Sequence, residues 1–186
     1  MVYLYVMASY LLGTVLTAAL VAKLKGVNLQ NENSGNLGAR NAGRTLGKSA
    51  FVIVAIGDGL KGLLVVLMGR MLELPELAIA LAVIAVVLGH LYPFWNKGQG
   101  GKGVATIIGA MAIFSLVHFV VFIIGFLISM FITKSATLSM VSGFVIYGIL
   151  VSIQFEAGWV ICVALLLVIW KQRKSILERV KPDVLE

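Results

Sequence analysis

The sequence predicts an all-α, polytopic integral membrane protein with about seven transmembrane helices, its N-terminus outside and its C-terminus in the cytoplasm. Of its 186 residues, 60% are hydrophobic and only 12% are charged, and the mean hydropathy is +1.03. Soluble domains carry about 25% charged residues, so too little polar surface exists here to coat a globule. These values exclude a disordered chain, a disulfide-rich secreted module and an ordinary soluble enzyme.

The whole chain, residues 1–186, is predicted to form a single transmembrane domain. No tandem repeat and no separate soluble segment is apparent. The one cysteine, Cys162, cannot form an internal disulfide, so the fold does not depend on an oxidising compartment.

The first apolar run covers residues 2–22. No Lys or Arg precedes it, and Lys23 and Lys25 follow it. A cleaved signal peptide has the opposite order of charge, so this run is predicted to be an uncleaved span that enters from outside. The later apolar runs are residues 49–68, 77–91, 104–132, 136–155 and 157–170.

The run that follows Lys102 is ambiguous in length. Residues 103–132 carry no formal charge. One helix of this length would be about 45 Å long, against a hydrocarbon core of about 30 Å. Two helices would each be short, with a turn near residues 115–118. Short spans would need tilt or local thinning of the bilayer.

The distribution of basic residues favours two crossings in this run. Seven spans would place the basic residues inside, leaving only Arg70 outside and Lys61 within a span. One crossing would move Lys134 and the basic residues of the C-terminal tail outside. The positive-inside rule therefore favours seven spans. It also explains most of the net charge of +7 without nucleic acid as a partner.

Two inner loops are long or unusual in composition. Residues 23–48 contain glycines, small polar side chains and cations, including the stretch Ser34-Gly35-Asn36-Leu37-Gly38-Ala39-Arg40-Asn41-Ala42-Gly43-Arg44. Glycine allows close approach of the backbone to an anion, and arginine can hold a phosphate with two hydrogen bonds. A phosphate site and a basic loop that touches anionic lipid headgroups both stay open at this point.

The second loop, residues 92–103, ends in Gly100-Gly101-Lys102-Gly103 just before an apolar run. Backbone N–H groups, the positive end of a helix dipole and a lysine would meet there, which is typical of an anion site. The loop is not a Walker A motif, because Asn96 occupies the position of the first glycine and Gly103 follows the lysine.

Asp58 and Lys61 interrupt the second apolar run three residues apart, on one face of the predicted helix. An unpaired charge at membrane depth costs at least about 2.5 kcal/mol. Both are therefore expected to face the protein interior or a polar cavity. They could hold helices in register, or they could orient the loops around a substrate.

His90 ends the third apolar run beside the glycine-rich loop. A histidine at this position is either an interfacial anchor or a group that shares a proton with an attacking hydroxyl. Its place on the same membrane face as Lys102 favours the second interpretation. His118 lies on the opposite side in the predicted topology and is left out of the site.

Taken together, these motifs resemble the PlsY-type acyl-phosphate:glycerol-3-phosphate acyltransferases. The first loop is similar to the family's first motif, and Asp58-x-x-Lys61-Gly62 is similar to its second-span signature. The family's central motif resembles Gly89-His90-x-x-Pro93 together with Gly100-Gly101-Lys102-Gly103-Val104-Ala105-Thr106. The resemblance covers nearly the whole chain, and the combination of motifs is highly specific.

The resemblance implies an enzyme of phospholipid synthesis in the bacterial cytoplasmic membrane, with its active site on the cytoplasmic side. Such enzymes transfer a fatty acyl group from acyl phosphate to the 1-hydroxyl of glycerol 3-phosphate, giving lysophosphatidic acid and phosphate. The expected partners are these two substrates and membrane lipids. The resemblance implies no cofactor and no metal, and nothing in the sequence points to an obligate protein partner.

Carried over by residue, the resemblance implies catalytic roles for His90 and Lys102. The residues expected to bind substrate are Ser34, Asn36, Asn41, Arg44, Gly100, Gly101, Gly103 and Thr137. Ser34, Arg44 and Lys102 would bind phosphate, and the three glycine amides would hold the acyl phosphate. Asp58 and Lys61 would support the site from behind.

The chain departs from the family pattern after its last apolar run. Gln172 and Ser175 stand where the family has the histidine and asparagine of an Arg-His-x-x-Asn motif. Two alternatives therefore stay open: a paralogue with a different acceptor, and a non-catalytic protein that binds phospholipid or phosphate. An unrelated channel is disfavoured, because the spans beyond Lys61 contain almost no ionisable residue.

Overall fold

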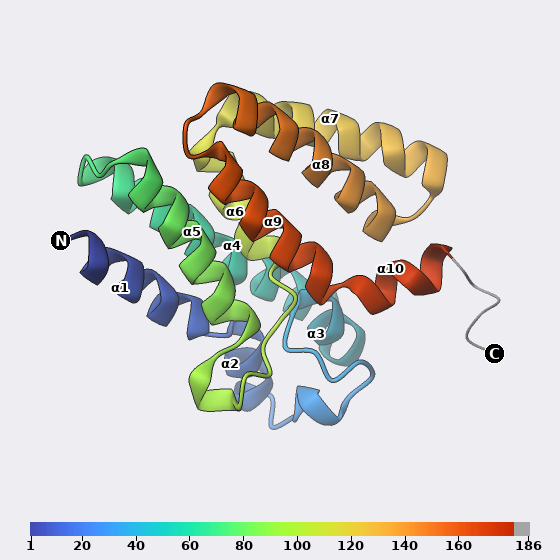
Figure 1. The fold of residues 1–186 in the computed structure, drawn as a ribbon. Coiled ribbons are helices and arrows are strands. Elements are labelled where there is room, and N and C mark those ends of the chain that lie inside the picture. Colours follow the sequence, from blue (N-terminus) through green and yellow to red (C-terminus); the bar gives the residue numbers. More distant parts are fainter. Residues whose placement is uncertain (181–186) are drawn as a thin grey trace. The chain divides into compact units, whose positions relative to one another are not determined.

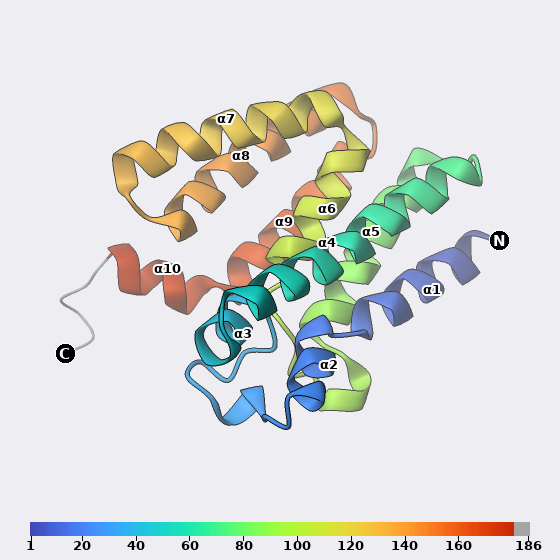
Figure 2. The same cartoon turned by 180° about the vertical axis from the view of Figure 1, so that it is seen from behind.

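The computed structural model describes residues 1–180, and every regular element in that range is helical (Figures 1 and 2). The α-helices are α1 (Val2–Thr14), α2 (Thr17–Leu24), α3 (Ala39–Leu46), α4 (Lys48–Met71), α5 (Glu76–Leu91), α6 (Val104–Phe114), α7 (Leu116–Thr133), α8 (Ala136–Gln154), α9 (Gly158–Lys171) and α10 (Arg173–Val180). Two 3₁₀ turns, Leu29–Asn31 and Phe94–Asn96, lie in the two polar loops.

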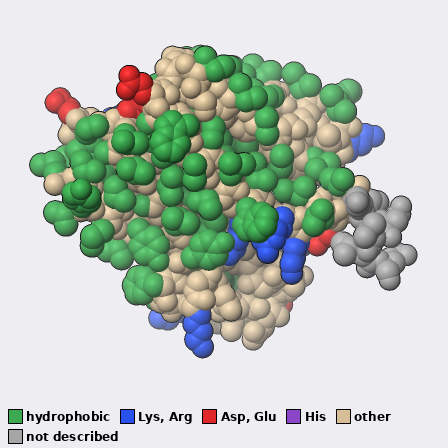
Figure 3. All heavy atoms as spheres, viewed as in Figure 1, with side chains coloured by type: hydrophobic (Ala, Val, Ile, Leu, Met, Phe, Trp, Pro, Cys, Tyr) green, Lys and Arg blue, Asp and Glu red, His purple; other side chains and the backbone are tan. Residues whose placement is uncertain are grey.

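The helices are those of a membrane protein. Five segments are long and apolar enough to cross a bilayer: Val2–Leu24, Lys48–Met71, Glu76–Asn96, Leu116–Thr133 and Ala136–Gln154. Two shorter apolar helices, α6 and α9, accompany them among the described residues. Large apolar side chains stay exposed along these helices, and Figure 3 shows hydrophobic side chains spread widely over the face that it displays. Such exposure suits contact with lipid.

The ambiguous run after Lys102 is divided at Ser115. Helix α6 ends at Phe114 and α7 begins at Leu116, and Ser115 itself is extended, with φ −156° and ψ 105°. The turn therefore falls where the two-helix interpretation placed it. At about 1.5 Å per residue, α6 is about 16 Å long, which is well short of a bilayer core.

The first apolar run differs from its prediction. It was expected to be one continuous span, but Val15 and Leu16 are extended and separate α1 from α2. Backbone groups freed by such a break need other partners when water is absent. Side chains from elsewhere in the fold supply them, as described for the site below.

The helices form two compact units, Met1–Phe114 and the part of the chain from Ser115 onward. In the first unit, α1 packs on α5, and α4 packs on α6. Glycines allow both contacts: a Cβ at Gly13 would overlap the Val86 carbonyl oxygen, and one at Gly109 would overlap the Gly59 carbonyl oxygen. Small residues of this kind let membrane helices approach closely.

Gly109→Ala is therefore expected to destabilise the protein by about 1–3 kcal/mol, because the added methyl group forces α6 away from α4. Unfolding followed by circular dichroism in detergent measures the effect. Gly59→Ala is the matched control in the same helix contact, since its Cβ would meet only the Ala105 carbonyl oxygen at an ordinary 3.5 Å. Equal stability of the two variants would contradict the packing argument.

The second unit is built on the hairpin of α7 and α8. Phe122 of α7 stacks on Phe144 of α8, with ring centroids 5.7 Å apart, and the backbone approaches closely at Gly143. His118 is buried in this unit, where its Nδ1 lies 2.7 Å from the Ser115 hydroxyl and its ring meets Tyr147 edge-on. His118 thus has local partners at the start of α7.

Candidate functional site

A buried ion pair on α4 forms the base of the site. Lys61 Nζ lies 3.0 Å from Asp58 Oδ1, and the two residues are 5% and 2% exposed. The spacing of three residues had placed both groups on one helix face, and the pair does form. A buried pair of this kind is tolerated only when further hydrogen bonds satisfy both charges.

Those further hydrogen bonds satisfy backbone groups at the break between α1 and α2. Lys61 Nζ donates to the Val15 carbonyl oxygen at 2.7 Å, and the Thr17 amide donates to Asp58 Oδ1 at 3.4 Å. From the second loop, the Trp95 indole N–H donates to the Thr14 carbonyl oxygen at 2.9 Å. The charged pair therefore replaces hydrogen bonds that a continuous helix would have made itself.

His90, 2% exposed at the end of α5, joins the same group of charges. Its Nδ1 lies 3.0 Å from Lys61 Nζ and 3.8 Å from Asp58 Oδ1. On the other side of the ring, Nε2 faces Gly101, where a Cβ would overlap it. The imidazole thus stands between the ion pair and the glycine-rich loop.

Gly100 and Gly101 hold that loop against the end of α5. The Gly101 amide donates to the His90 carbonyl oxygen at 3.0 Å, and the Gly100 amide donates to the Leu91 carbonyl oxygen at 3.2 Å. Both amides are thus engaged inside the protein, and the visible role of these two glycines is close packing. Their predicted contact with a phosphate stays a prediction.

Lys102 and Gly103 follow directly and lead into α6. Lys102 is half-buried, and Gly103 has φ +78°, a conformation that favours glycine. Because α6 begins at Val104, the positive end of its dipole adjoins Lys102. A cation and the N-terminus of a helix therefore adjoin each other at this point of the chain.

The first loop meets the second at Leu37, whose carbonyl oxygen lies next to Gly101. A hydrogen bond of 3.0 Å from Gln30 Nε2 to Gln99 Oε1 also joins the loops. Residues more than sixty positions apart in the sequence therefore share one location at the end of α5.

The predicted residues of the first loop divide into two groups. Asn41 is buried and ties the loop together: its Nδ2 donates to the Leu29 carbonyl oxygen at 2.9 Å, and its Oδ1 accepts from the Ser34 amide at 3.4 Å. Asn36 is half-buried, whereas the Ser34 and Arg44 side chains are exposed. Asn41 therefore shapes the loop, while Ser34 and Arg44 are open to a ligand.

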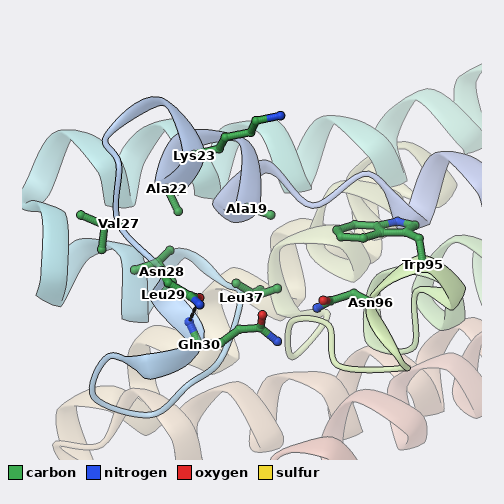
Figure 4. Close-up of a pocket in the computed structure, with 10 residues that line it drawn as sticks. All are labelled: Ala19, Ala22, Lys23, Val27, Asn28, Leu29, Gln30, Leu37, Trp95 and Asn96. Atoms are coloured by element: carbon green, nitrogen blue, oxygen red, sulfur yellow. Dashed lines mark hydrogen bonds between the residues drawn. The ribbon is translucent and has the colours of Figure 1, made fainter.

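A hollow of about 180 Å³ lies between α2 and the two loops (Figure 4). Gln30 and Asn96 point toward each other across it, and the Trp95 ring closes one side. Lys23 and Leu37 also line it. The hollow adjoins the loops at Leu37.

Thr137 lies in the first turn of α8, within the second unit, and is buried. Gln172, at the altered C-terminal motif, is buried in the same unit and donates from Nε2 to the Met140 sulfur at 3.0 Å. Within residues 1–180, no group of His, Cys, Asp or Glu side chains is arranged to hold a metal ion.

The sequence reasoning missed the contacts that link these residues. The hydrogen-bonding contact of Lys61 with His90 joins residues from different helices, so helical spacing carries no signal for it. No motif marks Trp95, whose indole stabilises the break between α1 and α2.

Comparisons with known proteins agree along most of the chain. The sequence model of the glycerol-3-phosphate acyltransferase family matches residues 3–181. A glycerol-3-phosphate acyltransferase 1 from Bacillus cereus is 45% identical over 139 residues, covering 72% of this chain and 76% of the relative. The glycerol-3-phosphate acyltransferase of Bacillus velezensis is 34% identical over 192 residues, covering 99% and 98%.

Solved structures give the same answer for the fold. The glycerol 3-phosphate form of PlsY (YgiH), an integral membrane glycerol 3-phosphate acyltransferase, superposes with a TM-score of 0.89 at 29% identity. The match covers 97% of this chain and 92% of that one. The lysophosphatidic acid form gives a TM-score of 0.87 at 28% identity. This chain is an integral membrane protein that belongs to the glycerol-3-phosphate acyltransferase family.

Proposed function

We propose that the protein transfers a fatty acyl group from acyl phosphate to the 1-hydroxyl of glycerol 3-phosphate. One observation carries the proposal: in a chain of this family, His90, Gly101 and the first loop meet at one point, with Lys102 next in sequence. Both substrates carry phosphate, and Lys102 stands beside the N-terminus of α6 next to this point.

The reaction needs little covalent help from the protein. The glycerol hydroxyl attacks the carbonyl carbon of the acyl phosphate, a new ester C–O bond forms, and the bond to the phosphate oxygen breaks. The hydroxyl proton passes to the departing phosphate. Acyl phosphate is a mixed anhydride with a good leaving group, so positioning and stabilisation of negative charge can supply the catalysis.

The predicted residues have distinct tasks in this proposal. Lys102 stabilises the phosphate as charge develops on it, and Ser34 and Arg44 bind substrate phosphate from the first loop. Asn36, Asn41 and Gly103 shape the contact surface, and Gly100 and Gly101 bring the loop against His90. Thr137 binds substrate from α8. Asp58 and Lys61 hold His90 from behind.

We further propose the topology that the loop charges favour. Seven spans, with α6 and α9 as the short ones, place the N-terminus outside and both polar loops on the cytoplasmic side of the bacterial inner membrane. The acyl tail would then stay among the helices while its phosphate reaches the loops. Residues 1–186 would act as a single domain.

Purified protein in detergent, with palmitoyl phosphate and labelled glycerol 3-phosphate, tests the proposal directly. Lysophosphatidic acid is expected from the parent protein, and Lys102→Ala is expected to reduce the rate at least about 100-fold, by loss of charge stabilisation. Folding of the variant is checked by its helical circular dichroism. Intact acyl phosphate in the presence of folded parent protein would reject the reaction.

A different acceptor is the second candidate, supported by Gln172 and Ser175 at the altered C-terminal motif. Gln172 is buried and its amide contacts the Met140 sulfur, so its side chain is not exposed to a ligand. Product analysis with a mixture of polyol phosphates separates the two: acylation of another polyol in preference to glycerol 3-phosphate would support the second candidate.

A further inference from the structure

We propose that Lys61 is a positioning residue that fixes His90 as the neutral ring with its proton on Nε2. His90 then presents a hydrogen-bond donor, and not a base, to the glycine-rich loop. The inference rests on the proposed function for what that donor would serve, but the protonation state can be measured without any substrate.

The first step is the hydrogen-bond accounting at Lys61. An ammonium group has three donors and no acceptor. Its close neighbours are Asp58 Oδ1 at 3.0 Å, the Val15 carbonyl oxygen at 2.7 Å and His90 Nδ1 at 3.0 Å, with the Gly13 carbonyl oxygen farther away at 3.4 Å. Three protons thus serve three close partners, and the first two are oxygens that can only accept.

The second step follows from the third partner. A charged Lys61 can approach His90 Nδ1 at this distance only if Nδ1 is an acceptor. In a neutral imidazole, the proton then resides on Nε2. The opposite assignment, in which Nδ1–H donates to Lys61, requires a neutral lysine, whereas the Asp58 carboxylate 3.0 Å from Lys61 Nζ favours the charged form.

Asp58 is the other charged group near His90 Nδ1. Its Oδ1 lies 3.8 Å from His90 Nδ1, outside hydrogen-bond distance, whereas it contacts Lys61 at 3.0 Å. Lys61 therefore stands between the carboxylate and the imidazole. Without it, the carboxylate would be the nearest charged group to Nδ1 and would draw the ring proton to that side.

The consequence lies at the loop. Nε2 is the ring atom that faces Gly101, where the two loops meet. An Nε2–H group there can donate to a phosphate, carbonyl or glycerol oxygen, but it cannot accept the hydroxyl proton. Proton transfer to the leaving phosphate, as written for the reaction above, then requires no base from His90.

Nitrogen-15 NMR of the histidine rings tests the inference on the intact protein. The expected spectrum of His90 has a bare Nδ1 and a protonated Nε2, identified through their couplings to the ring protons. His118 is the second histidine of the chain, and its signals are removed with His118→Gln. A proton on Nδ1, or on both nitrogens, at neutral pH would overturn the inference without any change at Lys61.

The variant Lys61→Met tests whether Lys61 determines the position of the ring proton on His90. This variant keeps the length of the side chain and removes every donor, so the ring proton is expected to move to Nδ1, toward Asp58. A folded variant that keeps the proton on Nε2 would show that Lys61 does not fix it. If the variant fails to fold, the parent spectrum still decides the protonation state.

The two proposals fail separately. A parent protein with Nε2–H on His90 but no acyl transfer would leave the positioning inference standing and remove the proposed reaction. Lysophosphatidic acid formation by a protein whose His90 carries its proton on Nδ1 would support the proposed reaction and overturn the positioning inference.

Discussion

Asp58→Ala is expected to destabilise the protein by about 3–5 kcal/mol, the largest effect of any single substitution considered. The carboxylate is 2% exposed and is the charged partner of Lys61 at 3.0 Å. Its removal leaves a buried ammonium group without its counterion and takes an acceptor from the Thr17 amide at the break between α1 and α2. Unfolding in mixed detergent, followed by circular dichroism, measures the loss.

The matched control removes the charge that Asp58 balances. In Asp58→Ala combined with Lys61→Met, no buried cation remains at the site of the pair, so the double variant is expected to be more stable than Asp58→Ala alone. The Val15 carbonyl oxygen still loses its donor, so recovery is incomplete. If Asp58→Ala stayed within about 1 kcal/mol of the parent, the pair would have no such role.

Gly101→Ala is expected to lower acyl transfer by about 100-fold or more. Its Cβ would overlap His90 Nε2 and come within 2.9 Å of the Leu37 carbonyl oxygen, so the imidazole or the loop contact must shift. Displacement of a reacting geometry by about 1 Å costs a factor of this size. Initial rates of lysophosphatidic acid formation measure it.

Gly59→Ala serves as the control for this variant as well, since its added Cβ meets only an ordinary contact. It is expected to retain most of the activity. Helical circular dichroism checks that both variants are folded before their rates are compared, because the overlap at Gly101 involves a buried ring and a backbone oxygen. A Gly101→Ala enzyme with the parent's rate would mean that close approach of the loop to His90 is not needed.

The apolar runs predicted most of the helices because hydrophobic length is what a bilayer selects. Helices α4, α5, α8 and α9 begin and end within a few residues of the runs. The break at Ser115 was also within reach of the sequence, since one helix of that length exceeds the bilayer. The charge of the loops and the length of the apolar run together predicted that break.

The break at Val15 was not predictable in the same way. The break falls at a valine and a leucine, and neither residue type predicts the end of a helix. The partners that stabilise the extended backbone are Lys61 and Trp95, which lie far along the chain. The site shows the same limit. Motifs named His90 and Gly101 separately, but only the packed helices place the ring of one against the backbone of the other.

The interrupted first run has a consequence for how the protein is made. Translation delivers Val15 well before Lys61 and Trp95, so the nascent segment enters the membrane without the side chains that later hold its extended residues. Lipid offers no substitute for those hydrogen bonds. We expect the segment to insert as one unbroken helix, with the Ala19 amide bonded to Val15 instead of to Leu16, its partner in the finished fold. The kink would then be a late step of biogenesis that marks a completed bundle.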